Sequence, residues 1–234
     1  MNSKILYDGG SFRDPQGRVF YFQNRVFREL DDEGYKQFLE FSKSPIYEVL
    51  IKKKLIVTSK IVDKNSLDFK SKQNIIEHDK ISFLSYCYEW SPKMLQDAAL
   101  HILNLQKRLL EYGYSLKDAT PYNIQFENGK PIWIDIPSIE KWDKKVSWFA
   151  YDQFCRFFLY SLLLNHYLKI DLKQILLSEL EGVSFEGTLK ALPFRAKINP
   201  KLFFDIALPS ILNKFIKEQA SYKIISSQKE NPHA

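Results

Sequence analysis

The stretch "SLKDATPYNIQFENGKPIWIDIPS", residues 115–138, decides the predicted fold of this chain. It holds two apolar runs, "NIQF" and "KPIWID", on either side of "ENG", a sequence typical of a tight β-hairpin turn. Asp118 and Asn123 come at or before the start of the first run, and Asp135 ends the second. Pairing of the two runs places Asn123 beside Asp135. The pattern therefore predicts three oxygen-bearing side chains at one end of a hairpin.

These three side chains have two interpretations. Asp and Asn are common in turns and caps, so an Asp-x4-Asn pair has no necessary chemistry. Alternatively, carboxylate and amide oxygens are ligands that Mg²⁺ takes together with substrate phosphates, and a further carboxylate can orient a hydroxyl nucleophile. The order of features favours the second interpretation: a long helix, the Asp-x4-Asn loop, a hairpin, a terminal Asp, and then a buried helix.

The segments on both sides of the hairpin are predicted to be helical. Ser91 is a suitable N-cap and Pro92 fits a first helical turn. Apolar residues then follow with helical spacing as far as Gly113, which is a natural stop. The segment 148–168 is apolar nearly all round, which is typical of a buried helix.

The N-terminal part is predicted to be rich in β-structure. Turn sequences at residues 14–17 and 23–24 separate runs of Val, Phe and Tyr, which indicates a hairpin. Helical spacing follows, with Asp31 or Asp32 as the cap and Pro45 as a break.

Two further segments, 55–63 and 80–90, are predicted to be strands, with a polar loop at 64–75. The expected fold class is α+β, with residues 1–90 forming a β-rich lobe that holds one or two helices. Residues 91–234 form the predicted helical lobe that carries the loop and hairpin, and a cleft between two such lobes is a common place for a ligand.

Composition indicates a soluble globular protein. Of 234 residues, 45% are hydrophobic and 26% are charged, with a formal charge of +6. This charge permits an anionic partner such as a nucleotide, but the lysines are scattered, so nucleic-acid binding is not expected. The four histidines share no ligand spacing, which argues against a zinc site.

Cysteine usage and hydropathy favour the cytoplasm. Cys87 and Cys155 form no CxxC pair and are expected to be small core residues in a reducing compartment. The N-terminus lacks the apolar run of a signal peptide. The most apolar segment, residues 154–168, is interrupted by polar side chains and is too short to span a bilayer.

The Asp118, Asn123 and Asp135 pattern resembles the catalytic core of the protein-kinase-like superfamily, in particular its aminoglycoside-phosphotransferase-like and small-molecule kinase branches. The resemblance implies a bilobal fold with a small β-rich N-lobe and a mainly helical C-lobe. It also implies ATP and Mg²⁺ as cofactors, with Asp118 catalytic and with Asn123 and Asp135 as metal ligands. Asp152, in "SWFAYDQFCRFFLYSLLL", would support the backbone of the catalytic loop.

The same resemblance suggests nucleotide-binding residues. "SYCYEW", residues 85–90, would be a hinge that meets adenine through main-chain groups, which makes Tyr88 and Glu89 cofactor-binding candidates. "DGGSFRD" would cover the phosphates, although Gly9 and Gly10 alone are a weak signal. Three basic residues near these motifs are candidate phosphate contacts: Arg13, Arg28 and Lys117.

A narrower resemblance rests on "GSFRD", "YEWS", "LQDAAL" and "LKDATPYNIQF". These look like the kinase-like segment found ahead of a SAM-dependent methyltransferase domain in some bacterial proteins. The match spans roughly residues 8–165. The chain has no GxGxG-type SAM loop, so a methyltransferase would be a further domain or a separate partner.

Departures from the kinase pattern bear on activity. Leu116 stands where kinases have His or Tyr, Thr120 stands where protein kinases have a phosphate-steering Lys, and Ile136-Pro137 replaces Phe-Gly after the metal-binding Asp. No strand reads V-A-I-K.

Three functional interpretations remain open. One is an ATP- and Mg²⁺-dependent phosphotransferase acting on a small-molecule or glycan hydroxyl. Another is a pseudokinase-like module that senses nucleotide or regulates a methyltransferase. The third is an unrelated α+β domain in which the three residues only form turns.

Overall fold

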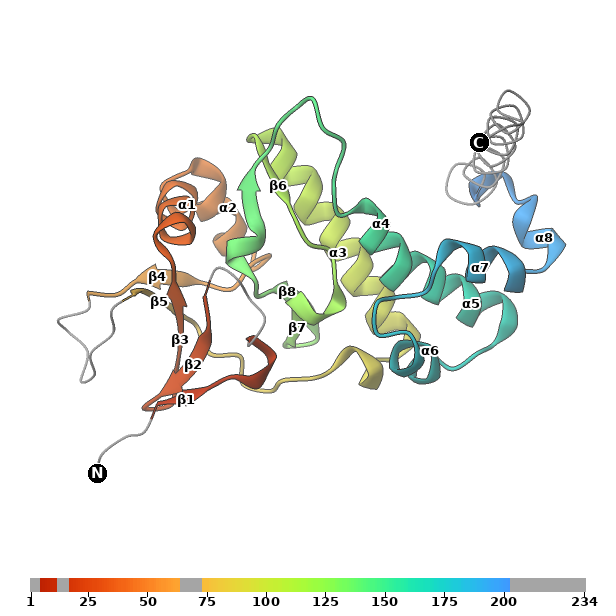
Figure 1. Ribbon diagram of the computed structural model, residues 1–234, viewed down its shortest axis with the longest axis horizontal. Coiled ribbons are helices and arrows are strands. Elements are labelled where there is room, and N and C mark those ends of the chain that lie inside the picture. Colours follow the sequence, from red (N-terminus) through yellow and green to blue (C-terminus); the bar gives the residue numbers. More distant parts are fainter. Residues whose placement is uncertain (1–4, 12–16, 64–72, 203–234) are drawn as a thin grey trace, which may run out of the picture.

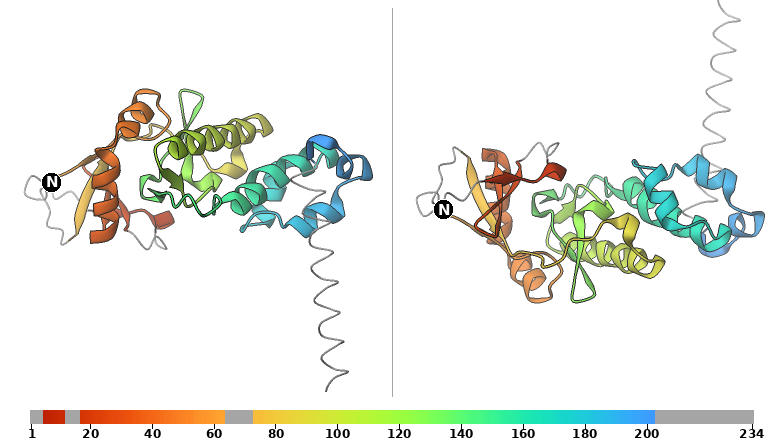
Figure 2. Two further views of the ribbon diagram at one scale, coloured as in Figure 1. Left: turned by 90° about the horizontal axis from the view of Figure 1, so that it is seen from above. Right: turned by 90° about the horizontal axis from the view of Figure 1, so that it is seen from below.

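The computed structural model describes residues 5–11, 17–63 and 73–202 (Figure 1). A small antiparallel sheet with two helices lies at one end of the molecule. A long helix with a short hairpin lies in the middle, and a group of shorter helices lies at the other end. The views from above and below show the same order along the long axis (Figure 2).

The sheet has five strands in the order β1-β2-β3-β5-β4, each antiparallel to its neighbours. The strands are β1 (Leu6–Tyr7), β2 (Val19–Phe22), β3 (Arg25–Leu30), β4 (Ser59–Ile61) and β5 (Asn74–His78). Gln23 and Asn24 join β2 to β3 with φ of 47° and 62°. Two successive positive φ values are those of the tight hairpin turn whose twist matches its strands, so the predicted turn at 23–24 is confirmed.

Two strand predictions need correction. Residues 80–90 form no strand; they run irregularly into a short 3₁₀ turn, η3 (Cys87–Glu89). The strand expected at 55–63 is confined to β4, and β5 begins inside the segment expected to be a loop. Residues 64–72 and 12–16, which include most of the predicted turn at 14–17, lie outside the described residues.

The two helices beside the sheet form as their sequence predicts. Asp31 caps α1 (Asp32–Ser42) by accepting a hydrogen bond from the backbone N of Gly34. Pro45 starts α2 (Pro45–Lys52). Phe38, Ile46 and Leu50 of these helices are buried, and they join the core beneath the sheet.

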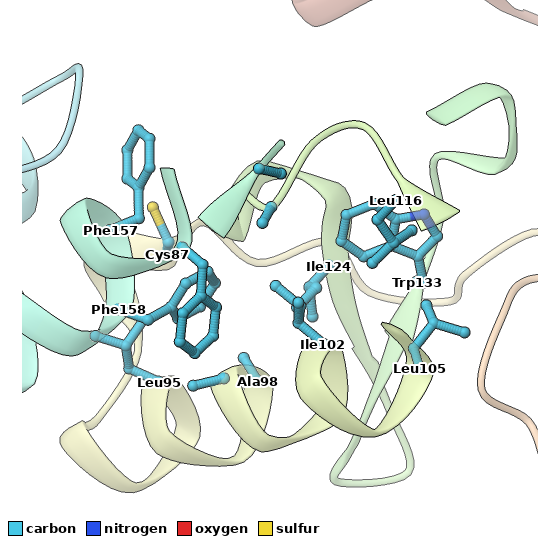
Figure 3. Close-up of a cluster of buried hydrophobic side chains, with 14 of the residues drawn as sticks. Cys87, Leu95, Ala98, Ile102, Leu105, Leu116, Ile124, Trp133, Phe157 and Phe158 are labelled. Atoms are coloured by element: carbon cyan, nitrogen blue, oxygen red, sulfur yellow. The ribbon is translucent and has the colours of Figure 1, made fainter. Parts of the chain in front are cut away.

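The central helix α3 (Pro92–Glu111) begins at Ser91, whose side chain accepts a hydrogen bond from the backbone N of Met94, as expected for an N-cap. It ends before Gly113, which has φ of 76°. One face of α3 packs against the hairpin and against the helix that follows (Figure 3). This continuous core also contains both cysteines, which are buried.

The apolar segment predicted as a buried helix is helical from Tyr151 to Leu168. It consists of α4 (Tyr151–Phe154), a π-helical turn, η6 (Cys155–Leu159), and α5 (Tyr160–Leu168). Three shorter helices follow: α6 (Leu172–Ser178), α7 (Phe185–Ala191) and α8 (Phe194–Lys197). No helix within the described ranges combines the length and the apolar character needed to cross a membrane.

The fold class is therefore α+β, as predicted, with an antiparallel sheet in the first ninety residues and mainly helices after them. This arrangement is consistent with the bilobal kinase-like fold. The division into domains at residues 90 and 91 stays a prediction.

Candidate functional site

The hairpin at the centre of the site is formed by β7 (Ile124–Glu127) and β8 (Lys130–Trp133). Its turn is Asn128-Gly129, with φ of 51° and 73°. Ile124 pairs with Trp133, and the backbone N of Ile134 donates to Asn123 O at 3.0 Å. The predicted hairpin and its register are confirmed, and Asn123 lies beside the segment that leads to Asp135.

The sequence suggested that Asp135 ends the second strand of the hairpin, but β8 stops at Trp133. Instead Asp135 begins a tight turn, η5 (Ile136–Ser138). Its carbonyl oxygen accepts hydrogen bonds from Trp133 Nε1 and Ser138 Oγ, both at 2.7 Å. The carbonyl oxygen of Asp135 is thus held by two side chains, and its carboxylate makes separate contacts.

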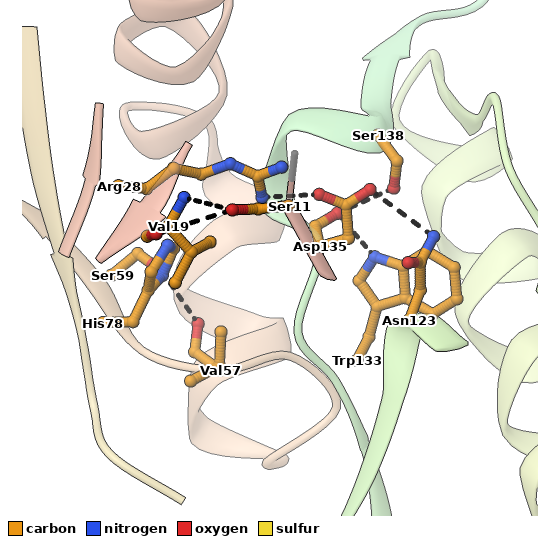
Figure 4. Close-up of polar contacts among 10 residues, drawn as sticks. All are labelled: Ser11, Val19, Arg28, Val57, Ser59, His78, Asn123, Trp133, Asp135 and Ser138. Atoms are coloured by element: carbon orange, nitrogen blue, oxygen red, sulfur yellow. Dashed lines mark hydrogen bonds and ion pairs between the residues drawn. The ribbon is translucent and has the colours of Figure 1, made fainter. Parts of the chain in front are cut away.

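That carboxylate joins the sheet to the hairpin (Figure 4). Arg28 Nη1 on β3 lies 2.6 Å from Asp135 Oδ1, and the two side chains are only 6% and 17% exposed. Asn123 Nδ2 lies 3.4 Å from the other carboxylate oxygen. The sequence proposed Arg28 only as one of several basic candidates, and the structure places it directly at Asp135.

Asp118, in the loop before the hairpin, is half-buried and lies close enough to Asp135 to be affected by its charge. Burial raises the pKa of Asp118, and the negative charge of Asp135 raises it further, while Lys117 and a hydrogen bond from Gln153 lower it. Two carboxylates that repel each other across a partly buried site are a common feature of acid–base chemistry. The site thus gathers Asp118, Asn123 and Asp135, as predicted, together with Arg28.

The residue that supports the loop differs from the one predicted. Asp152 is exposed, whereas Gln153 Oε1 accepts a hydrogen bond from the backbone N of Ala119 at 2.5 Å. Successive residues on a helix point about 100° apart, and the register of α4 turns Gln153, rather than Asp152, toward the loop. The assignment of loop support to Asp152 is corrected accordingly.

Substituting Gln153 and Asp152 one at a time tests this assignment directly. We expect Gln153→Leu to lower the free energy of unfolding by about 1–3 kcal/mol, because the N–H of buried Ala119 loses its acceptor. Asp152→Asn should cost about 0.5 kcal/mol or less, the usual range for an exposed site. Urea denaturation of both variants measures the difference, and an equal loss in the two would contradict the assignment to Gln153.

Of the remaining candidates, Lys117 lies beside this cluster, where its charge lowers the pKa of Asp118, whereas Tyr88 and Glu89 belong to the η3 turn. Lys117 follows β6 (Tyr114–Leu116), and its backbone N donates to Ser138 O at 2.9 Å. Glu89 is exposed and accepts a hydrogen bond from the backbone N of Tyr86, so its side chain caps its own turn. Tyr88 stacks on Tyr86 with a centroid separation of 5.5 Å. Arg13 lies outside the described residues.

Sequence reasoning missed the contact that anchors the segment predicted as a hinge. Gln125 on β7 accepts from the backbone N of Ser85 at 2.9 Å and donates to Ser85 O at 3.2 Å. Trp90 Nε1 also donates to Ser85 Oγ. Nothing in the sequence indicates that Ser85 contacts Gln125. The one available signal is that Gln125 is a polar residue at a buried position of β7.

Potential metal ligands are few. Within the described ranges, no group of three or more His, Cys, Asp and Glu side chains could hold a metal ion. A cation at Asn123 and Asp135 would therefore need further oxygen ligands from phosphate or water, which is the usual coordination of Mg²⁺ at nucleotide sites. The oxygen donors fit such an ion, provided that Arg28 gives up Asp135 Oδ1 and that the Asn123 amide, whose Nδ2 points to Asp135, turns its Oδ1 toward the metal.

The chain is similar to a curated protein in sequence and to several solved proteins in structure. No family model matches the chain. It is 35% identical over 210 residues to Nodulation protein NoeA of Rhizobium meliloti (strain 1021), a match that covers 87% of this chain and 43% of that protein. The chain thus spans less than half the length of this relative.

Two of the solved structures that are similar to this chain share little sequence identity with it. Vaccinia related kinase 3 has a TM-score of 0.42 at 13% identity, over 61% of this chain and 50% of that chain. WbdD, in a low-resolution structure with its C-terminal bundle ordered to residue 505, has a TM-score of 0.41 at 13% identity, over 98% of this chain and 55% of that one.

Proposed function

We propose that this chain is an ATP- and Mg²⁺-dependent phosphotransferase that acts on a hydroxyl group of a small molecule or glycan. The observation that carries the proposal is the convergence on the Asp135 carboxylate. Arg28 on β3 and Asn123 at the start of the hairpin both contact this carboxylate. Burial raises the pKa of Asp118, and the negative charge of Asp135 raises it further. A domain in which these residues only formed turns would not need to bring them together.

Each side chain then has a distinct task. Asn123 and Asp135 would hold the Mg²⁺ that neutralises charge on the phosphates during transfer. Asp118 would orient the acceptor hydroxyl and accept its proton, and a raised pKa makes a carboxylate a stronger base. Arg28 would move from Asp135 to a phosphate oxygen, where its planar guanidinium can donate two hydrogen bonds.

A second candidate function has its own support. The Arg28–Asp135 ion pair satisfies the carboxylate without a metal, which suits a pseudokinase-like module that senses nucleotide or regulates a partner. The chain matches less than half of a longer relative, which leaves room for another domain in that protein. The resemblance noted in the sequence suggests that this other domain is a methyltransferase. Magnesium-dependent nucleotide binding separates a working site from a purely structural one.

Calorimetric titration of ATP, with Mg²⁺ and with EDTA, tests the proposal. We expect binding in the micromolar range that weakens at least about tenfold without the metal, because Asp135 then has only Arg28 to neutralise it. Asp118→Asn should keep this binding and lose phosphate transfer to water or an added hydroxyl acceptor. Absence of binding by the folded wild-type chain would exclude the phosphotransferase and leave the regulatory module.

A further inference from the structure

A buried histidine lies on the face of the sheet that meets the hairpin. On β3, Val26 and Arg28 share a face because they are two residues apart. Val26 pairs with His78 on β5, and His78 pairs in turn with Ser59 on β4. His78 is thus on the same face as Arg28, in the next row of residues, with 7% of its surface exposed.

The hydrogen bonds of this histidine define which ring nitrogen carries the proton. Burial, together with the charge of Arg28 and against the opposing charge of Glu77, lowers the pKa of His78 to about 3, so the ring is neutral and holds one N–H. Nδ1 lies 2.7 Å from Ser59 Oγ, which lies 3.3 Å from Val57 O. We assign the single hydroxyl proton of Ser59 to the carbonyl, which can only accept and would otherwise lose this donor. In that arrangement His78 Nδ1 is the donor and Nε2 is a bare acceptor.

No described residue donates to that acceptor. His78 Nε2 is buried and has no hydrogen-bond partner among the described residues. Leaving a buried polar atom unpaired destabilises the fold, and such atoms in native proteins are rare enough to require an explanation. A ligand that donates a hydrogen bond to Nε2 would remove this cost.

The surroundings of His78 suit a flat, mostly apolar ring. Val19, Tyr21 and Val26 lie on the same face and are only half-buried, although Phe20, Phe22 and Phe27 on the opposite face are fully buried. These three half-buried side chains form a strip that lies next to Arg28, the proposed phosphate contact.

We propose that His78 is a nucleobase-reading residue, whose Nε2 accepts a hydrogen bond from the exocyclic amino group of adenine and disfavours the carbonyl oxygen of guanine. This inference rests on the proposed function and adds a specificity to it. Nε2 is buried in this structure, so base reading requires that it become accessible when metal and nucleotide separate the Arg28–Asp135 ion pair. Ser59 is a positioning residue, because it fixes the proton on Nδ1.

Titrations of Mg-ATP and Mg-GTP into three proteins test this inference. The wild type should bind ATP at least about tenfold more tightly than GTP. His78→Leu should weaken ATP binding about tenfold and leave GTP binding unchanged. Ser59→Ala should reduce the ATP-to-GTP ratio while the fold is kept, because either ring nitrogen can then carry the proton. The ¹⁵N shifts of His78 should report Nδ1–H in the wild type and a tautomer mixture in this variant.

The outcomes separate this inference from the proposed function. Mg²⁺-dependent binding of both nucleotides with equal affinity, or an equal effect of His78→Leu on both, overturns base reading by His78 and leaves the phosphotransferase intact. Failure of the folded wild type to bind either nucleotide overturns both proposals. Circular dichroism of each variant identifies loss of fold, and His78→Gln then replaces His78→Leu, with the same expected fall in the ratio because its amide can also donate.

Discussion

Asp135→Asn is expected to abolish Mg²⁺-dependent ATP binding and also to destabilise the protein. The metal would lose its one charged protein ligand, so the affinity for Mg-ATP should fall at least about 100-fold. Arg28 is 6% exposed and would keep its charge without a carboxylate beside it. Removing one partner of a buried ion pair typically costs about 3–5 kcal/mol. Calorimetry and urea denaturation measure the two effects separately.

The double variant Arg28→Met/Asp135→Asn distinguishes loss of a ligand from loss of fold. Replacing both charges removes the unpaired guanidinium, so most of the stability should return, while Mg-ATP binding should remain absent. Arg28→Met alone is the matched control, because it keeps the metal carboxylate while it loses the ion pair and the proposed phosphate contact. Recovery of Mg-ATP binding in the double variant would show that Asp135 is a structural residue and not a metal ligand.

Local features of this chain could be predicted because their causes are local. The turn at Asn128-Gly129 needs two positive φ values, and these two residue types adopt them readily. The caps at Asp31 and Ser91 form because their side chains accept hydrogen bonds from backbone groups three residues on. Such contacts join residues that are close in the sequence, so they follow directly from its pattern.

Contacts between distant residues could not be predicted in the same way. Arg28 and Asp135 are 107 positions apart, and only the folded sheet and hairpin bring them together. The aromatic segment 80–90 has the composition of a strand, yet the Gln125 side chain binds both main-chain groups of Ser85. A side chain that competes in this way for backbone hydrogen bonds is a known alternative to a sheet ladder.

The sequence pointed to Asp152 instead of Gln153 as the residue that supports the loop for a similar reason. The sequence pattern of a kinase-like helix identifies an acidic residue at this position, but the contact depends on the rotation of α4 about its axis. The burial of Phe154 and Phe158 in the core sets which face of this helix points inward. Packing of this kind is a property of the whole core, and a motif alone does not contain it.

Trp133→Ala is expected to be the most destabilising single substitution in the hairpin. The side chain is fully buried, with 0% exposure, and its Nε1 donates to Asp135 O. Its main chain also connects the hairpin to the segment before β4: its N donates to Leu55 O at 3.1 Å, and its O accepts from the backbone N of Val57 at 2.8 Å. Truncating a buried Trp to Ala typically costs about 3–5 kcal/mol, a large part of the stability of an average domain.

Trp142→Ala provides the control of matched chemistry. Trp142 is half-buried, and its Nε1 also donates to a carbonyl, that of Val146 at 3.0 Å. Its loss should cost about 1 kcal/mol, because less apolar surface leaves the core and water can reach the freed carbonyl. Urea midpoints for the two variants should therefore differ clearly. Equal midpoints would mean that Trp133 does not hold the hairpin in place, and the support for Asp135 would then have to come from Ser138, Arg28 and Asn123.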